Sequence, residues 1–289
     1  MTIPFPYPDQ GEIPEPVIGD REFAAVAAFL LAQTGISLKP SHRVMVEGRL
    51  ARIVRASGGD FDRYWSSAVA VPAERQRLVN ALTTNTTHFF REPVHFRTLR
   101  STIVPRLLRH AGPSGRLKVW SAASSNGAEA YSVAMMLESM QAQEGGFPYA
   151  VLGTDISTDV ITEARRAVYD RSLADLVPPA FRQEYMRSSG DPAKAGLFRV
   201  APRIRRHVSF RPMNLMDAAY PVDRDVDVVM LRNVLIYFGD AGRRHVIRTL
   251  AGHLRPGGYM LLGLTEGSIG VGLGLETVGP SVFRKPGGG

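Results

Sequence analysis

Two loops contain the residues whose types and spacing best suit ligand binding. The first, SAASSNGAEAYS (residues 121–132), follows a β-favouring run and opens a helical pattern, which would present backbone N–H groups to a ligand. The second, GTDIS (residues 153–157), ends the next β-favouring run with Asp155. A carboxylate at this position of an α/β sheet can accept hydrogen bonds from both hydroxyls of a ribose. It can also cap the following helix, a task that Ser157 or Thr158 would suit equally.

The glycine content of the first loop restricts the ligand further. The loop contains a single glycine, Gly127, whereas a pyrophosphate requires the closer backbone approach of a G-x-G-x-x-G loop. The pattern therefore favours a nucleoside without a pyrophosphate, and S-adenosylmethionine fits that description. A second glycine-spaced run, GVGLGLETVG (residues 270–279), has no clear helix after it and predicts a turn before the final strand.

Strands and helices alternate after about Ser101 and would position both loops. Short β-favouring runs occupy residues 116–122, 149–157, 226–233 and 257–264, and helical patterns occupy residues 128–140 and 241–254. This alternation predicts an α/β fold with a parallel, doubly wound sheet, whose ligand crevice lies at the carboxyl ends of the strands.

A helical region precedes the sheet. Apolar residues recur at three- and four-residue spacing over residues 20–82, which predicts a small all-helical domain. The second helix of this domain has a basic face formed by Arg43, Arg49, Arg52 and Arg55. That face is either solvated or a docking surface for an acidic partner. Residues 1–19 and 286–289 lack apolar periodicity, which predicts flexible tails.

The composition limits the classes of function. The 289 residues have a net charge of +8 and no cysteine, so thiol chemistry is excluded and the partners would be acidic proteins, nucleic acids or anionic membrane surfaces. Genome composition explains the arginine excess equally well. There is no apolar run of about 18 residues and no secretory signal pattern, which predicts a cytoplasmic protein without membrane insertion. Nothing in the sequence requires a metal.

Several motifs, in the same order, resemble the chemotaxis receptor methyltransferases, the CheR family. They are LTTNTTHFFRE (residues 82–92), VWSAASSNGAEAYSVAMML (119–137), GTDIS, NLMD (214–217), LRNVLIYF (231–238) and LRPGGYMLLGLTE (254–266). The likeness covers Arg21 to Lys285. The motifs LTTNTTHFFRE and RNVLIYF are specific to the family, whereas LRPGG occurs in many methyltransferases.

The resemblance implies an architecture and an activity. The helical domain would be joined to a Rossmann-like methyltransferase domain over residues 83–285, with a small antiparallel β insertion at about residues 195–212. The protein would transfer a methyl group from S-adenosylmethionine to glutamate side chains of chemotaxis receptors, forming methyl esters and S-adenosylhomocysteine. Its partners would be the cytoplasmic domains of methyl-accepting chemotaxis receptors, with Arg49, Arg52 and Arg55 as docking candidates.

The resemblance also implies site residues. The positions that match cofactor contacts are Asn85, Thr87, Arg91, Glu129, Asp155, Asn214, Leu215, Arg232 and Asn233. Tyr237 matches a tyrosine proposed to lie beside the transferred methyl group, so Arg91 and Tyr237 are the candidate catalytic residues. Judged on residue type alone, Arg91 would form a surface ion pair with Glu92 or another carboxylate, and Tyr237 would be a core aromatic.

The chain departs from the family pattern in two places. The first loop more usually reads G-E-E-P-Y-S, so Ala128 and Ala130 replace a glutamate and a proline, which bears on cofactor affinity but not on the fold. The run GLTE (residues 263–266) replaces a more usual glycine, histidine or serine, serine, glutamate.

The implied chemistry needs no general base. A glutamate side chain with a pKa of about 4.3 is already an anion at neutral pH, so the enzyme need only orient and desolvate it. Two other functions stay open. A nucleic-acid methyltransferase suits the basic charge, although the chain has no D/N-P-P-Y run and no clear RNA-binding motif. A non-catalytic cofactor-binding or receptor-scaffolding relative suits the altered first loop.

Overall fold

The computed structural model describes residues 18–110, 115–141, 146–270 and 272–287. Residues 1–17 of the predicted N-terminal tail and residues 288–289 of the predicted C-terminal tail lie outside these ranges. Ile18 falls within the predicted tail, yet its side chain is buried in the core of the helical domain. The packed chain therefore begins before residue 20.

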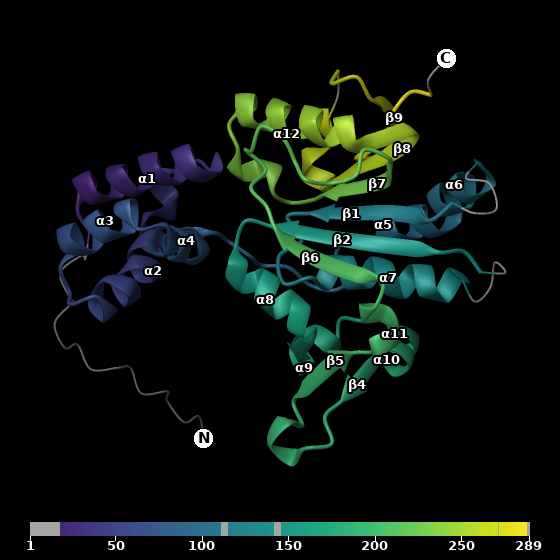
Figure 1. The fold of residues 1–289 in the computed structure, drawn as a ribbon, viewed down its shortest axis with the longest axis horizontal. Coiled ribbons are helices and arrows are strands. Elements are labelled where there is room, and N and C mark those ends of the chain that lie inside the picture. The colour runs from purple at the N-terminus through teal and green to yellow at the C-terminus, as the bar shows by residue number, and fades with distance from the viewer. Residues whose placement is uncertain (1–17, 111–114, 142–145, 271, 288–289) are drawn as a thin grey trace, which may run out of the picture.

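The described chain before residue 83 is helical and stands to one side of the sheet (Figure 1). Its elements are α1 (Asp20–Thr34), the 3-10 turn η1 (Pro40–His42), α2 (Arg43–Ala56), α3 (Phe61–Ala70) and α4 (Pro72–Leu82). Gly35 ends α1 with a left-handed φ of 72°, and Asp60 caps α3 by accepting a hydrogen bond from the Arg63 N–H. The apolar faces of the helices meet in one core, as the periodicity predicts.

A seven-stranded sheet forms the centre of the second region, with strand order β6-β2-β1-β7-β8-β10-β9. In that order the strands are Val208–Pro212, Tyr149–Asp155, Leu117–Ala122, Val226–Leu231, Leu254–Leu262, Val282–Arg284 and Glu276–Gly279. The first five run parallel, and β10 pairs antiparallel with β8 and β9. Strand order reverses between β1 and β7, which confirms the predicted doubly wound sheet. In such sheets the ligand crevice lies at the carboxyl ends of the strands around that reversal.

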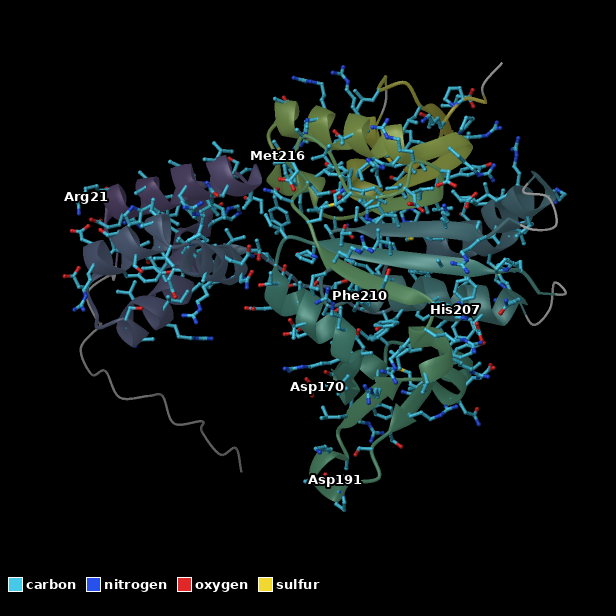
Figure 2. All side chains as sticks on the ribbon, in the orientation of Figure 1. Arg21, Asp170, Asp191, His207, Phe210 and Met216 are labelled. Carbon is cyan, nitrogen blue, oxygen red and sulfur yellow. The ribbon has the colours of Figure 1, made fainter. Side chains whose placement is uncertain are left out.

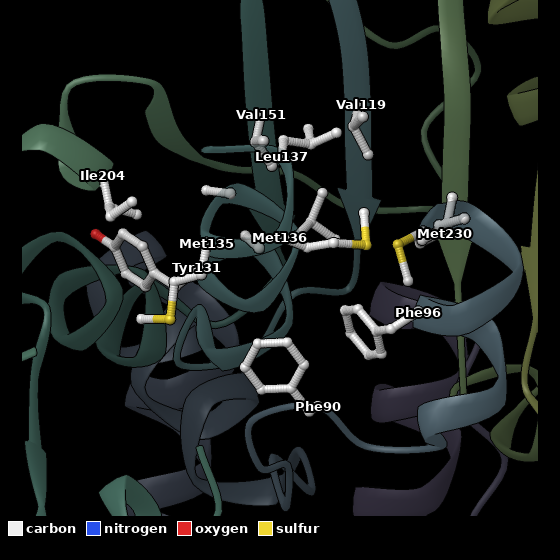
Figure 3. Close-up of a cluster of buried hydrophobic side chains, with 14 of the residues drawn as sticks. Phe90, Phe96, Val119, Tyr131, Met135, Met136, Leu137, Val151, Ile204 and Met230 are labelled. Atoms are coloured by element: carbon white, nitrogen blue, oxygen red, sulfur yellow. The ribbon is translucent and has the colours of Figure 1, made fainter. Parts of the chain in front are cut away.

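Helices cover the two faces of this sheet. Alternate residues of β1 and β7 point to opposite sides: Val119 packs with the side chains of α7 (Ala128–Gln141), whereas Trp120 packs in the core that includes α12 (Asp240–His253). The first of these cores also contains Phe90 and Phe96 and is drawn in Figure 3. The remaining helical elements are α5 (Pro93–Thr98), η2 (Leu99–Ile103), α6 (Val104–His110), α8 (Thr158–Arg166), α9 (Arg171–Ala174), α10 (Pro179–Tyr185), η3 (Pro192–Lys194), α11 (Pro202–Arg205), η4 (Leu235–Tyr237) and η5 (Leu264–Gly270).

A small antiparallel sheet is present, but its extent differs from the prediction. Its strands are β3 (Val168–Asp170), β5 (Leu197–Val200) and β4 (Met186–Ser188), in that order. The sheet therefore begins well before residue 195. Residues 208–212, predicted to belong to it, form β6 instead, which pairs in parallel with β2 at the edge of the large sheet. A short strand carries no mark of which neighbour it will pair with, because pairing depends on tertiary context.

The glycine-spaced run near the C-terminus forms the predicted turn. Gly272 and Gly274 have left-handed φ values of 77° and 81°, and β9 follows and pairs with the final strand β10. No helix of the described chain is both long and apolar enough to cross a membrane.

The helical region and the sheet region meet at several hydrogen-bonded points. Ile36 forms an antiparallel bridge with Phe238, and the Ser37 N–H donates to the Tyr237 carbonyl at 2.9 Å. Figure 2 shows Met216 at this boundary. A side chain at Gly35 would lie 2.7 Å from Met216, so glycine is needed both for the left-handed turn and for the close approach.

A second junction joins α4 to α8. Asn80 Nδ2 donates to Thr158 Oγ1 at 2.9 Å, Asn80 Oδ1 accepts from the Thr158 N–H at 3.1 Å, and Gln76 Nε2 donates to the Ile156 carbonyl at 2.9 Å. The two regions are thus fixed relative to each other around the carboxyl end of β2.

Candidate active site

A cavity of about 360 Å³ lies between the helical region and the carboxyl ends of β1, β2, β6 and β7. This volume falls in the range of small-molecule sites. The helical region contributes mainly apolar or neutral groups to the wall, among them Ile36, Leu38 and Met45. The loops of the sheet contribute the charged groups.

The loop between β1 and α7 bends sharply at the cavity wall. Ala123, Ser125 and Gly127 all have left-handed φ values, of 57°, 50° and 86°. A Cβ at Gly127 would lie 2.8 Å from the Phe210 ring and 2.9 Å from Ala164, so only glycine lets the start of α7 pack this closely. This bend places Ser125 against the segment that follows α4, where its hydroxyl donates a hydrogen bond to the Asn85 carbonyl at 2.7 Å.

Asp155 lies at the end of β2 with its carboxylate held by backbone groups. Its oxygens accept hydrogen bonds from the Ser125 N–H at 2.9 Å and the Ser157 N–H at 3.0 Å. No cation of the described chain forms an ion pair with it. Burial raises the pKa of Asp155, and the hydrogen bonds from the backbone oppose that rise only in part. The carboxylate therefore has lone pairs available for a ligand.

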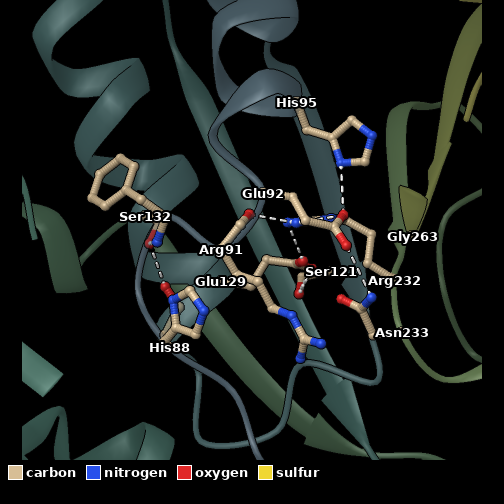
Figure 4. Close-up of polar contacts among 12 residues, drawn as sticks. His88, Arg91, Glu92, His95, Ser121, Glu129, Ser132, Arg232, Asn233 and Gly263 are labelled. Carbon is tan, nitrogen blue, oxygen red and sulfur yellow. Dashed lines mark hydrogen bonds and ion pairs between the residues drawn. The ribbon is translucent and has the colours of Figure 1, made fainter. Parts of the chain in front are cut away.

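The other charged wall is an ion-pair network around the buried side chain of Arg232 (Figure 4). Its Nη1 donates to Glu129 Oε2 at 2.9 Å, and its Nη2 donates to Glu92 Oε2 at 3.1 Å and to the Arg91 carbonyl. Ser121 Oγ donates to the second Glu129 oxygen at 2.7 Å. One guanidinium thus fixes two carboxylates and the backbone of the segment that carries Arg91.

Asn233 has a left-handed conformation and is held by Glu92 and by a further carboxylate, that of Glu266. Its Nδ2 donates to Glu92 Oε1 at 3.0 Å, and its backbone N–H donates to Glu266 Oε2 at 2.8 Å. Burial by itself would raise the pKa of Glu92, but the hydrogen bond from Asn233 together with the charge and hydrogen bond of Arg232 lowers it. Glu92 therefore stays ionised and anchors both Arg232 and Asn233.

The segment LTTNTTHFFRE crosses from α4 to the sheet along this wall. Phe89 and Phe90 insert into the core beneath α7, and Phe90 adopts a left-handed φ of 53°. Asn85, Thr87 and Arg91 line the cavity. The two phenylalanines thus anchor the segment, with Asn85 and Thr87 before them and Arg91 after them at the cavity wall.

Arg91 and Tyr237 both face the cavity. Arg91 Nη1 donates to the Thr86 carbonyl at 3.3 Å, and none of the described carboxylates pairs with its guanidinium. The ion pair with Glu92 expected from residue type alone is wrong, because Glu92 binds Arg232 instead. Tyr237 is half-buried at the cavity wall, so its ring does not belong to the core.

Each cofactor-binding position implied by the resemblance lies on this cavity wall. The set is Asn85, Thr87, Arg91, Glu129, Asp155, Asn214, Leu215, Arg232 and Asn233. Asn214 is oriented by donating to the Gln33 carbonyl at 2.7 Å and accepting from the Met216 N–H at 2.9 Å. In the altered first loop, Ala128 and Ala130 are fully buried and neither lines the cavity, whereas Glu129 does.

Residue-level reasoning missed three groups behind the wall: Glu92, His95 and Glu266. Glu92 and Glu266 lie inside the quoted motifs, but Arg232 is 140 positions from Glu92, and Asn233 is 33 positions from Glu266. His95 is buried beside Glu92, with 3.3 Å between Nδ1 and Oε2, and burial followed by the charge of Arg232 lowers its pKa to about 4. No local pattern marks these contacts.

The basic face of α2 is not uniform. Arg49 Nη1 donates to the carbonyls of Ala81, Leu82 and Thr83 at 3.3, 3.1 and 2.9 Å, which caps the C-terminus of α4. Arg52 and Arg55 are exposed, and neither forms an ion pair within the described chain. Arg49 thus has a structural task that its two neighbours lack.

Two family models match the chain. The model described as "CheR methyltransferase, all-alpha domain" matches residues 21–83, and "CheR methyltransferase, SAM binding domain" matches residues 85–270. The chain belongs to the CheR methyltransferase family. This confirms the resemblance read from the motifs.

Curated relatives agree with the CheR assignment. A chemotaxis protein methyltransferase of Vibrio parahaemolyticus is 36% identical over 93% of this chain and 98% of that protein. "Chemotaxis protein methyltransferase 2" of Pseudomonas aeruginosa is 34% identical over 93% and 97% of the two chains. The enzyme of Salmonella typhimurium is 36% identical over 86% of this chain and 84% of that protein. The protein is thus a chemotaxis methyltransferase with an S-adenosylmethionine-binding domain.

Proposed function

We propose that this CheR protein methylates glutamate side chains of chemotaxis receptors, with S-adenosylmethionine as methyl donor. The observation that supports the proposal is that one cavity is lined by every residue that the resemblance implies for cofactor binding and catalysis. One of them, Arg91, pairs with no carboxylate of the described chain. A receptor carboxylate is an anion, and Arg91 is the cation that would meet it.

The cavity wall has the donors and acceptors that S-adenosylmethionine needs. Asp155 would accept hydrogen bonds from the ribose hydroxyls, and Glu129 would face a cationic group of the cofactor. The adenine would pack against Met213, Leu215 and Phe238. Arg232 fixes Glu129 in place through its 2.9 Å ion pair. The bound cofactor supplies a methyl group carried on a positively charged sulfur.

The protein's own residues would orient the acceptor. Arg91 would hold the incoming glutamate carboxylate by a charge-assisted hydrogen bond and exclude water from it, while the oxygen that accepts the methyl group stays free. Tyr237 would donate a hydrogen bond or pack its ring against the positive sulfur. No proton has to be removed from the acceptor, because the carboxylate is ionised at neutral pH.

Methyl transfer from tritiated S-adenosylmethionine to receptor-rich membranes of the source organism tests this function. Carboxyl methyl esters release volatile methanol in mild alkali, so alkali-labile label on a receptor is the expected result. Label that resists alkali would indicate nitrogen or nucleic-acid methylation and would overturn the proposal. Cofactor binding without label on any receptor would support the scaffolding alternative.

We further propose that Arg52 and Arg55 dock the receptor, because both are exposed cations on α2 and the receptor presents carboxylates. Replacing both by glutamate should slow receptor methylation several-fold, mainly through the rate of encounter. The cofactor dissociation constant should be unchanged. The paired reversal of Arg211→Glu with Arg224→Glu changes two exposed charges elsewhere and serves as the matched control. An equal rate in the double variant and the control would mean that the α2 face is only solvated.

A further inference from the structure

Two exposed aliphatic side chains lie beside the catalytic wall. Ile236 is 47% exposed although it lies between buried Leu235 and cavity-lining Tyr237, and Leu264 is 44% exposed and follows buried Gly263. Ile236 directly precedes Tyr237, which lines the cavity. We call Ile236 and Leu264 the apolar lip.

The backbone segments that carry the two halves of the lip are adjacent in space. The carboxylate of Glu266 accepts hydrogen bonds from the Ile236 N–H at 3.3 Å and from the Gly263 N–H at 2.9 Å. Two backbones that bind one carboxylate must lie side by side. The same carboxylate also accepts from the Asn233 N–H at 2.8 Å, which ties the lip to the cavity wall.

The backbone of the lip is fixed rather than loose. Glu266 is fully buried, and a Cβ at Gly263 would lie 2.6 Å from its Oε2 and 2.9 Å from the Asn233 backbone nitrogen, so only glycine permits this packing. On the other side, the Leu264 N–H lies 3.3 Å from Glu92 Oε2. The same carboxylates that fix the site thus fix two aliphatic side chains that point to solvent.

The carboxylates near the lip already have partners within the protein. Glu92 is paired with Arg232, and Glu266 is satisfied by backbone N–H groups. A partner that reaches the site therefore meets an aliphatic surface at the lip and a free guanidinium at Arg91.

We propose that the apolar lip is a specificity element that binds an aliphatic side chain next to the target glutamate. The inference rests on the proposed receptor function. The occupant is the receptor segment that carries the acceptor carboxylate, because that segment must approach the Asn233 and Tyr237 wall and the lip adjoins that wall. Burying an aliphatic contact of this size changes transfer efficiency by about tenfold.

The test combines enzyme variants with substrate variants. A receptor cytoplasmic fragment is prepared with leucine or with serine beside its methylated glutamate, and kcat/KM is measured for each. The wild-type enzyme should prefer the leucine form by about tenfold, and the double variant Ile236→Ser, Leu264→Ser should show little preference. Its cofactor dissociation constant should match that of the wild type, because neither side chain lines the cavity.

Val278→Ser and Leu176→Ser are matched controls, since both side chains are 50% exposed and lie outside the site. Both controls should keep the wild-type preference. A wild-type enzyme that methylates both fragments equally, or a double variant that keeps the preference, would overturn the lip assignment and leave the receptor function standing. A wild-type enzyme that methylates no receptor fragment or membrane would overturn the receptor function and the lip assignment together.

Discussion

Asp155 and Glu92 are buried or nearly buried carboxylates at the same site, yet their pKa values move in opposite directions. The pKa of Asp155 is raised, because burial outweighs the backbone hydrogen bonds it accepts. The pKa of Glu92 is lowered, because Asn233 and Arg232 outweigh the effect of burial. The difference separates two kinds of carboxylate. The charge of the first is destabilised by burial in the unliganded protein and would be used by a ligand, and the charge of the second forms contacts that stabilise the fold.

The largest effect is expected from Arg91. It is a cation of the same site, and no carboxylate of the described chain neutralises it. Arg91→Ala should lower kcat by about 10² to 10³, the usual loss when one group that stabilises a reacting charge is removed. The thermal midpoint should change little, since the side chain makes one hydrogen bond of 3.3 Å. Turnover and differential scanning calorimetry check this. Near-normal turnover would remove Arg91 from the catalytic assignment.

Asp155 should affect ligand binding next most strongly. Asp155→Ala should weaken cofactor binding by about 10- to 100-fold, because charge-assisted hydrogen bonds to the ribose are lost. Titration calorimetry with S-adenosylmethionine and with S-adenosylhomocysteine measures this directly. Both ligands carry the ribose, so both should lose affinity alike. An unchanged dissociation constant would contradict the ribose assignment.

Stability provides the sharpest contrast between the two carboxylates. Glu92→Gln should lower the free energy of unfolding at pH 7 by about 1 to 3 kcal/mol, because Arg232 loses one charged partner. Asp155→Asn should lower it less. It loses the acceptor for one of the two backbone N–H groups of Ser125 and Ser157, but it also removes the charge that burial penalises. Urea denaturation of the unliganded proteins checks both values. Equal decreases in the free energy of unfolding of the two variants would contradict the distinction between the two carboxylates.

The smallest effect concerns His95, whose pKa is lowered from 6.5 to about 4 by burial and by the charge of Arg232. Below pH 6.5 the unfolded chain binds this proton and the folded protein does not, so stability falls as pH falls through that window. Between pH 7 and 5.5 the loss is about 1 kcal/mol. His95→Phe should flatten this part of the pH profile of unfolding, and an unchanged slope would contradict the burial effect.

The sequence predicts the parts of the fold that depend on local pattern. Alternating runs predict the parallel sheet, and three- and four-residue spacing predicts the helical domain. The extent of the small sheet was not predictable, because residues 208–212 are a short strand whose pairing with β2 is chosen by tertiary context. The burial of Ile18 was missed for a similar reason, since a single apolar residue beside prolines has no periodicity to read.

For the candidate site, the motif residues that face the cavity could be predicted from the sequence, but the ion-pair and hydrogen-bond partners that hold them could not. Residue type alone would pair Glu92 or another carboxylate with Arg91, whereas Glu92 pairs with Arg232, 140 positions away. The Arg49 guanidinium binds carbonyls at the end of α4, which its spacing on the helix does not reveal, and a docking role for Arg49 stays a prediction. Ionic partners depend on which charges the fold brings together. The ligand roles of the cavity residues stay predictions for the experiments above.

The bridge between Ile36 and Phe238 has a thermodynamic consequence. Because Ile36 and Leu38 from the helical region and Asp155 from the sheet region line one cavity, a ligand that contacts both walls binds the docked arrangement better than any separated one. Linkage then makes the two effects equal. The free energy by which the bound ligand stabilises the docked arrangement is also the free energy by which docking strengthens ligand binding. Cofactor affinity and the cooperativity of unfolding between the two regions should therefore rise and fall together across variants of this bridge.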